Sequence, residues 1–203
     1  MSLILNTYFS KDINLTGAQI NVVASAWLNE YEEDILKKLL GYTLYKALIA
    51  DLNGTSEPTL QRFKELIDGA DLTFTTINGY EVITRWVGLR NKTLLKSLIA
   101  YYVYYQYRNE EESFNSGSGQ KSGLAENSES VSAAPKLINT WNKMVDWYGK
   151  IPTNIAYPEY FLNQNNYRHF NPDASAFNFL LANIDTYPEW VFEPLDTINI
   201  FGI

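Results

Sequence analysis

His169 is the only histidine in the chain, so a Ser-His-Asp triad or a histidine-based metal site would have to use it. It lies in the segment Asn165-Asn-Tyr-Arg-His-Phe170, where no partner residue stands at a recognisable spacing. We therefore interpret His169 as a surface or capping histidine.

A second candidate for chemistry is Gly117-Ser-Gly-Gln-Lys-Ser122, which superficially resembles a phosphate-binding loop. That motif needs a glycine directly before the lysine and another five residues earlier. Gln120 and Asn115 occupy those positions, and no apolar strand precedes the segment. The match fails, and we expect no nucleotide-binding loop here.

The third candidate is the acidic cluster of Glu30, Glu32, Glu33 and Asp34. Glu30 and Asp34 are four residues apart and share a helix face, where two carboxylates could bind a divalent ion or act as an acid–base pair. The cluster is expected opposite the apolar positions Tyr31 and Ile35, so we interpret it as a solvated face. We expect no enzymatic activity, no cofactor and no catalytic or metal-binding residue; an enzyme with an unrecognised carboxylate site is the last-ranked alternative.

Composition narrows the class of protein further. The chain has 203 residues, a formal net charge of −7, no cysteine and 15 tyrosines. An acidic chain does not attract phosphate backbones through its overall field, and its longest basic run is Lys37-Lys38. Disulfides and thiolate chemistry are excluded, and we expect neither a signal peptide nor a membrane span. A single domain with extended arms is the expected organisation.

Helical patterns occupy the first third of the chain. Thr16 and Gln19 form a capping box before apolar residues at three- and four-residue spacing, which predicts a helix ending at Gly41. A second helix should run from there to Asn53-Gly54, and a third from Glu57-Pro58 to Asp68-Gly69.

The period then changes. Residues 72–84 are rich in β-forming residues around Asn78-Gly79, which predicts a small β-hairpin. Residues 86–108 return to a helical pattern that is apolar on nearly all sides, with Leu94 and Leu95 on its main face. Such a helix is either buried or meets partners on two faces, and we favour a central core helix.

In the last part of the chain, predicted helices alternate with irregular segments. Half of residues 113–132 are Ser or Gly, which predicts a flexible loop from about 112 to 132. A helix over 133–149 follows, then a short one near 158–164 and a last one capped by Asp173. Residues 187–203 form an apolar tail that must pack on its own domain or dock elsewhere.

The order of these segments resembles the head–tail connector proteins (adaptors, or neck rings) of tailed bacteriophages, particularly those that infect Bacteroidetes. The similarity covers nearly the whole chain. It is carried by residues 34–45 (DILKKLLGYTLY), 86–90 (WVGLR), 97–105 (SLIAYYVYY), 141–148 (WNKMVDWY), 179–183 (FLLAN), 187–190 (YPEW) and 198–203 (INIFGI).

The sequence pattern predicts a mainly α-helical bundle (residues 1–170) with a small inserted β-hairpin, followed by a C-terminal helix and extended arm (171–203). The resemblance implies that the helical bundle is the body and that the C-terminal arm docks into the portal. The hairpin and the length and aromatic content of the arm depart from the family's pattern. The resemblance also implies a homo-oligomeric ring, twelvefold on the portal protein, at the head–tail junction of a virion assembled in the host cytoplasm. Tail or other neck proteins would be further partners, and DNA would pass without sequence-specific binding.

Large apolar and aromatic side chains usually dominate such interfaces. We therefore predict partner contacts for the C-terminal residues Trp190, Phe192, Ile200 and Phe201, and for the hairpin residues Phe74, Ile77 and Tyr80. The alternative is a monomeric protein-binding or regulatory module of a phage or bacterium, whose tail would pack on its own body.

Overall fold

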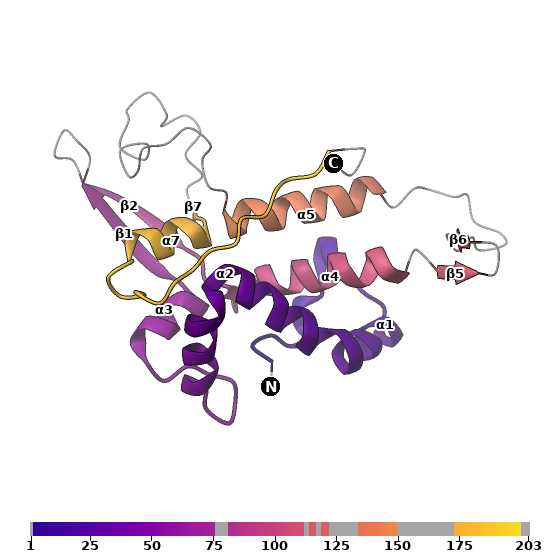
Figure 1. Ribbon diagram of the computed structural model, residues 1–203, viewed down its shortest axis with the longest axis horizontal. Helices are drawn as coiled ribbons and strands as arrows, with labels where there is room; N and C mark the ends of the chain where they lie inside the picture. The colour runs from indigo at the N-terminus through magenta and orange to yellow at the C-terminus, as the bar shows by residue number, and fades with distance from the viewer. Residues whose placement is uncertain are drawn as a thin grey trace.

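The computed structural model describes residues 2–75, 81–111, 114–116, 119–121, 134–149 and 173–199. The protein is mainly α-helical, as predicted. Three helices form its body: α2 (Leu28–Asp51), α4 (Leu98–Glu111) and α5 (Ala134–Tyr148). Helix α4 contacts both of the others, and the small sheet lies at one end (Figure 1).

The N-terminal segment is packed into the core before the first α-helix begins. Two short 3-10 helices, η1 (Asn6–Tyr8) and η2 (Lys11–Ile13), precede α1 (Gly17–Val22). The predicted capping box is confirmed: Gln19 N donates to Thr16 Oγ1, and Thr16 N donates to Gln19 Oε1 at 3.0 Å. A π-helical turn, η3 (Val23–Trp27), joins α1 to α2.

Helix α2 is interrupted at Gly41, where the sequence predicts a helix end. Gly41 has φ 73° and ψ 161°, which is far from helical geometry. The chain resumes the helix afterwards and continues to Asp51, so the two predicted helices are the two parts of α2. Leu36, Leu39, Leu40 and Leu44 are all buried around the break, which therefore lies in the core.

Helix α4 begins twelve residues later than the predicted start at residue 86. The chain from Arg90 to Ser97 instead forms a two-stranded ladder, β3 (Arg90–Asn91) with β4 (Lys96–Ser97). Gly88 has φ 88°, and a Cβ there would lie 2.4 Å from the Ile67 carbonyl oxygen, so the chain turns at a close backbone approach. Leu94 and Leu95 are consequently 51% and 41% exposed, and their placement on the helix face was wrong.

From Leu98 onward the prediction of a buried core helix is confirmed. The side chains of Tyr101, Tyr102, Tyr104 and Tyr107 are each 3–4% exposed. Ser97 Oγ accepts from Ala100 N and donates to the Leu89 carbonyl, which fixes the helix start.

The predicted hairpin is confirmed in its strands. Strand β1 (Ala70–Thr75) pairs antiparallel with β2 (Glu81–Trp86), in a register that places Thr75 opposite Glu81. Asn78 and Gly79 lie outside the described residues. Strand β7 (Asp173–Ala174) adds to β2 in parallel.

Trp86 connects this sheet to two helices. It is fully buried, and its indole N–H donates to the Leu66 carbonyl of α3 (Gln61–Asp68). Its ring stacks on Phe179 of α7 (Ala176–Ala182).

Four smaller predictions have different outcomes. Helix α5 matches the expected range within a residue. The cap of α7 is Ser175, whose hydroxyl accepts from Asn178 N; Asp173 pairs in the sheet instead, so its predicted capping role was wrong. A short ladder of β5 (Phe114–Ser116) with β6 (Gly119–Lys121) lies where a loop was predicted. The short helix expected near 158–164 lies outside the described residues.

The Gly41 geometry gives a direct test of the break. A Cβ on Gly41 would lie 2.8 Å from Val191 Cβ, and the positive φ disfavours any L side chain. Gly41→Ala should therefore lower the free energy of unfolding by roughly 1 to 3 kcal/mol in chemical denaturation. Gly17→Ala is the matched control, because a Cβ there meets nothing within 4 Å. Equal stability of the two variants would contradict the break.

Candidate functional site

The acidic cluster of α2 does not form a joint site. Glu32 is only 4% exposed, so its placement on a solvated face was wrong; it accepts hydrogen bonds from Leu3 N at 2.8 Å and from Ser2 Oγ at 2.5 Å. Burial raises the pKa of Glu32, against the lowering effect of these hydrogen bonds. Glu33 instead pairs with Lys37, and Asp34 with Lys38 and the Tyr102 hydroxyl.

The described part of the chain shows no metal-binding or nucleotide-binding site elsewhere. There, no group of three or more His, Asp or Glu side chains is placed to hold a metal ion. His169 lies outside the described residues, as do Gly117, Ser118 and Ser122 of the apparent phosphate loop.

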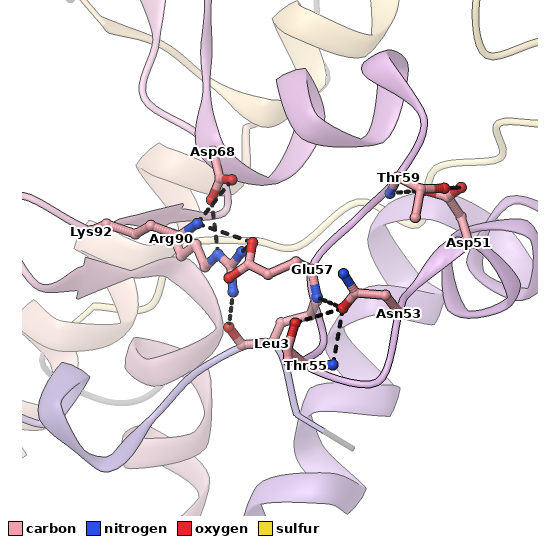
Figure 2. A network of polar contacts seen from close by, with 9 residues as sticks. All are labelled: Leu3, Asp51, Asn53, Thr55, Glu57, Thr59, Asp68, Arg90 and Lys92. Atoms are coloured by element: carbon pink, nitrogen blue, oxygen red, sulfur yellow. Dashed lines mark hydrogen bonds and ion pairs between the residues drawn. The ribbon is translucent and has the colours of Figure 1, made fainter.

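Arg90 is the centre of a polar network that fixes the N-terminal segment (Figure 2). Its side chain is 5% exposed, and Nε donates to Asp68 at 2.9 Å, Nη2 to Glu57 at 2.5 Å and Nη1 to the Leu3 carbonyl at 2.7 Å. Lys92 bridges the same two carboxylates at 3.0 and 3.2 Å. Burial alone would lower the pKa of Arg90, but the hydrogen bonds and charges of Asp68 and Glu57 raise it.

The loop beside this network is held by two side chains at the end of α2 (Figure 2). Asn53 Oδ1 accepts from Thr55 N and Glu57 N at 2.9 and 3.0 Å, and Asp51 accepts from Thr59 N at 2.8 Å. These bonds place Glu57 against Arg90. We interpret the whole network as a structural joint between the N-terminus, α3 and β3.

A cavity of about 340 Å³ opens between β3, α4 and α5. It is lined by Val87, Asn91, Leu94, Lys96, Tyr101, Lys143, Asp146, Trp147 and Ala174. Beside it, Asp12 accepts from Lys143 at 2.9 Å and from the Tyr101 hydroxyl at 2.7 Å. Burial would raise the pKa of Asp12, but these two partners lower it. The mixture of lysine and aspartate charges gives the cavity no clear preference for one sign of ligand.

The C-terminal arm (residues 187–203) is described as far as Asn199, and this described part lies along the body (Figure 1). Tyr187 is fully buried, and its hydroxyl donates to the Arg62 carbonyl at 2.5 Å. The arm then meets the break in α2: Trp190 Nε1 donates to the Leu39 carbonyl at 2.8 Å, Val191 N to Leu40 at 3.2 Å and Glu193 N to Lys38 at 2.9 Å. A helix end leaves carbonyls without partners, and the arm supplies donors for three of them.

Beyond Glu193 the arm follows α5. Tyr148 OH donates to the Glu193 carbonyl at 2.5 Å, and Trp141 Nε1 donates to the Asp196 carbonyl at 2.7 Å. Asn142 makes a pair of bonds to Ile198, accepting from its N and donating to its carbonyl, both at 2.9 Å. We call these groups the arm site: the Lys38–Gly41 backbone with Trp141, Asn142 and Tyr148.

The predicted partner-binding residues are distributed over two regions. Trp190 and Phe192 are half-buried on the protein's own body, where their rings lie 5.9 Å apart and Phe192 lies 5.0 Å from Tyr148. Phe74 lies in β1 opposite Val82. Ile200, Phe201, Ile77 and Tyr80 lie outside the described residues, as does the predicted boundary at residue 170. The partner role of all seven stays a prediction.

Sequence reasoning found the helix break but missed the arm site. Gly41 carried a recognisable signal, because glycine commonly follows a helix end. Asn142 carried none, since an asparagine on a helix face is ordinary until a backbone segment lies beside it.

Comparisons with known proteins give no family: no protein-family model, curated protein or solved structure matches the chain. None of the described helices is both long and apolar enough to cross a membrane.

The Arg90 network predicts unequal effects for its two cations. Arg90→Ala should lower the free energy of unfolding by about 2 to 3 kcal/mol, because the Leu3 carbonyl and both carboxylates lose a buried donor. Lys92→Ala is the matched control, because Lys92 pairs with the same carboxylates but is 51% exposed; its loss should stay below about 1 kcal/mol. Similar losses in urea denaturation would contradict a central role for Arg90.

Proposed function

We propose that this chain is a structural subunit of the neck of a tailed bacteriophage, joining the portal vertex of the capsid to the tail. The observation that carries the proposal is the order of the seven sequence segments from residue 34 to residue 203, which is similar to that of head–tail connectors. In this role the subunits form a ring that continues the DNA channel, twelvefold where it meets the portal.

The architecture is compatible with such a subunit. A ring with cyclic symmetry uses two different surfaces on each copy, because each contact is head-to-tail. A body of packed helices that carries an extended C-terminal arm on its surface can offer two such surfaces. We propose the arm and the β1–β2 hairpin as the parts that contact the portal or a neighbouring copy.

Charge supports a passive role toward DNA. A net charge of −7 disfavours tight binding to phosphate backbones, so a ring of such subunits would let DNA pass without holding it. The proposed role needs no catalytic residue and no cofactor. It places the protein at the head–tail junction of the virion, after assembly in the host cytoplasm.

A second candidate is a monomeric protein-binding or regulatory module. One observation favours it: the arm, as far as Asn199, packs on the protein's own helices. A monomer with a permanently docked arm would have that arrangement, whereas a neck subunit would use the arm for contacts with another protein.

Light scattering on the purified chain, alone and with its cognate portal protein, separates the two candidates. The neck role predicts a ring, either alone or on the portal with matching symmetry. Removing residues 195–203 should leave a folded body that binds the portal more weakly. The cut is placed after Pro194 because Tyr187 is fully buried, so a cut at residue 187 would test folding as well. A monomer that ignores the portal would contradict the neck role and favour the binding module.

A further inference from the structure

We propose that Glu32 makes the attachment of the N-terminal segment depend on pH, through one proton that it shares with Ser2. With this proton bound, residues 2–4 are held in the core; without it, they detach more readily. We call residues 2–4 the N-terminal hook. The proposal goes beyond the neck role and does not depend on it, so each can fail without the other.

The hydrogen bonds around Ser2 need one hydrogen more than the hook contains when Glu32 is ionised. Ser2 Oγ lies 2.5 Å from Glu32 Oε2 and 3.0 Å from the Ile4 carbonyl oxygen, and it accepts from Ile4 N at 3.2 Å. A hydroxyl carries one hydrogen, whereas a carboxylate and a carbonyl only accept. With an ionised Glu32, Ser2 can therefore donate to only one of its two neighbouring oxygens.

A protonated Glu32 completes the same contacts without any movement. Its Oε2–H donates to Ser2 Oγ, and the Ser2 hydroxyl then donates to the Ile4 carbonyl. Glu32 Oε1 still accepts from Leu3 N at 2.8 Å. The arrangement of the hook therefore fits the neutral acid better than the carboxylate.

The surroundings of Glu32 favour the neutral form as well. Glu32 is 4% exposed, and no lysine or arginine of the described residues forms an ion pair with it. Arg90 is bonded to two other carboxylates and to the Leu3 carbonyl. Burial raises the pKa of Glu32, and the Ser2 and Leu3 hydrogen bonds, the amino group of the chain and Arg90 lower it by less. The titratable group beside it on α2 is Tyr45, whose own pKa is raised by burial.

The hook can detach while the rest of the N-terminal segment stays in place. Residues 5–7 are exposed, and the chain enters the core again at Tyr8 and Phe9, which are 4% and 3% exposed. The hook is therefore connected to a fixed point by three residues that pack on little. Its detachment would bring Glu32 into contact with water, where a carboxylate is stable without the Ser2 proton.

The direction of the pH dependence follows from these two states. The attached hook holds the Glu32 proton more tightly than the detached hook does, because the pKa of Glu32 is raised only while it is buried. Raising the pH from the ordinary glutamate pKa of 4.5 therefore favours detachment. The effect levels off above the raised pKa, where Glu32 is ionised in both states.

The test uses the full chain and two NMR measurements over a range of pH. The carbon-13 shift of the Glu32 carboxyl reports its pKa. The protection of the Leu3 amide against hydrogen exchange, corrected for the intrinsic effect of pH on exchange, reports detachment of the hook. Glu32→Gln imitates the neutral acid, since its amide accepts from Leu3 N, donates to Ser2 Oγ and does not titrate. Glu33→Gln is the matched control, because Glu33 is 49% exposed and pairs with Lys37.

The proposal predicts that protection of Leu3 in the unmodified chain falls roughly tenfold per pH unit between the ordinary and the raised pKa of Glu32. Glu33→Gln should behave in the same way, whereas Glu32→Gln should keep its protection at every pH. The same fall in Glu32→Gln, no fall in the unmodified chain, or a Glu32 pKa at or below 4.5 overturns the proposal. So does equal protection of Leu3 and the core residue Val103 at every pH, because the hook would then detach only with global unfolding.

Discussion

Three consecutive backbone carbonyls at the break in α2, those of Lys38, Leu39 and Leu40, accept hydrogen bonds from the C-terminal arm. A helix that stops inside the core leaves such carbonyls unpaired, and a buried unpaired carbonyl is unfavourable. The arm meets this requirement, and it can approach because Gly41 has no Cβ where Val191 lies. The break and the arm therefore depend on each other, and the path of the arm along α5 follows from that first contact.

The N-terminal end is fixed by the same kind of contact. Leu3 N donates to the buried carboxylate of Glu32, and the Leu3 carbonyl accepts from the buried guanidinium of Arg90. Two groups of opposite charge on α2 and β3 thus hold one residue from both sides. Both ends of the described chain are bound through their main chain to the helical body. The two ends differ in burial: the N-terminal contacts of Leu3 are buried, whereas the contacts of the arm with Asn142 of α5 are only partly buried.

Local signals in the sequence were sufficient for much of the fold. The capping box at Thr16, the break at Gly41, the hairpin strands and helix α5 each follow from a few neighbouring residues, and each is confirmed. The predicted start of α4 at residue 86 was wrong. Leu94 and Leu95 match the helical period, but a close backbone approach at Gly88 turns the chain before the helix begins. Glu32 was placed in solvent because its partners, Ser2 and Leu3, lie about thirty positions earlier. The arm site was not predictable for the same reason: Asn142 and Ile198 are 56 residues apart.

Amide hydrogen exchange at Val191 and Glu193 tests the contact between the break and the arm most directly. Both amides lie in a segment without regular secondary structure, so any protection must come from the α2 carbonyls that accept their hydrogen bonds. The account predicts that both exchange far more slowly than the exposed amide of Thr197. Exchange of all three at the rate of an unstructured peptide would mean that the arm is not docked at the break and would contradict the account.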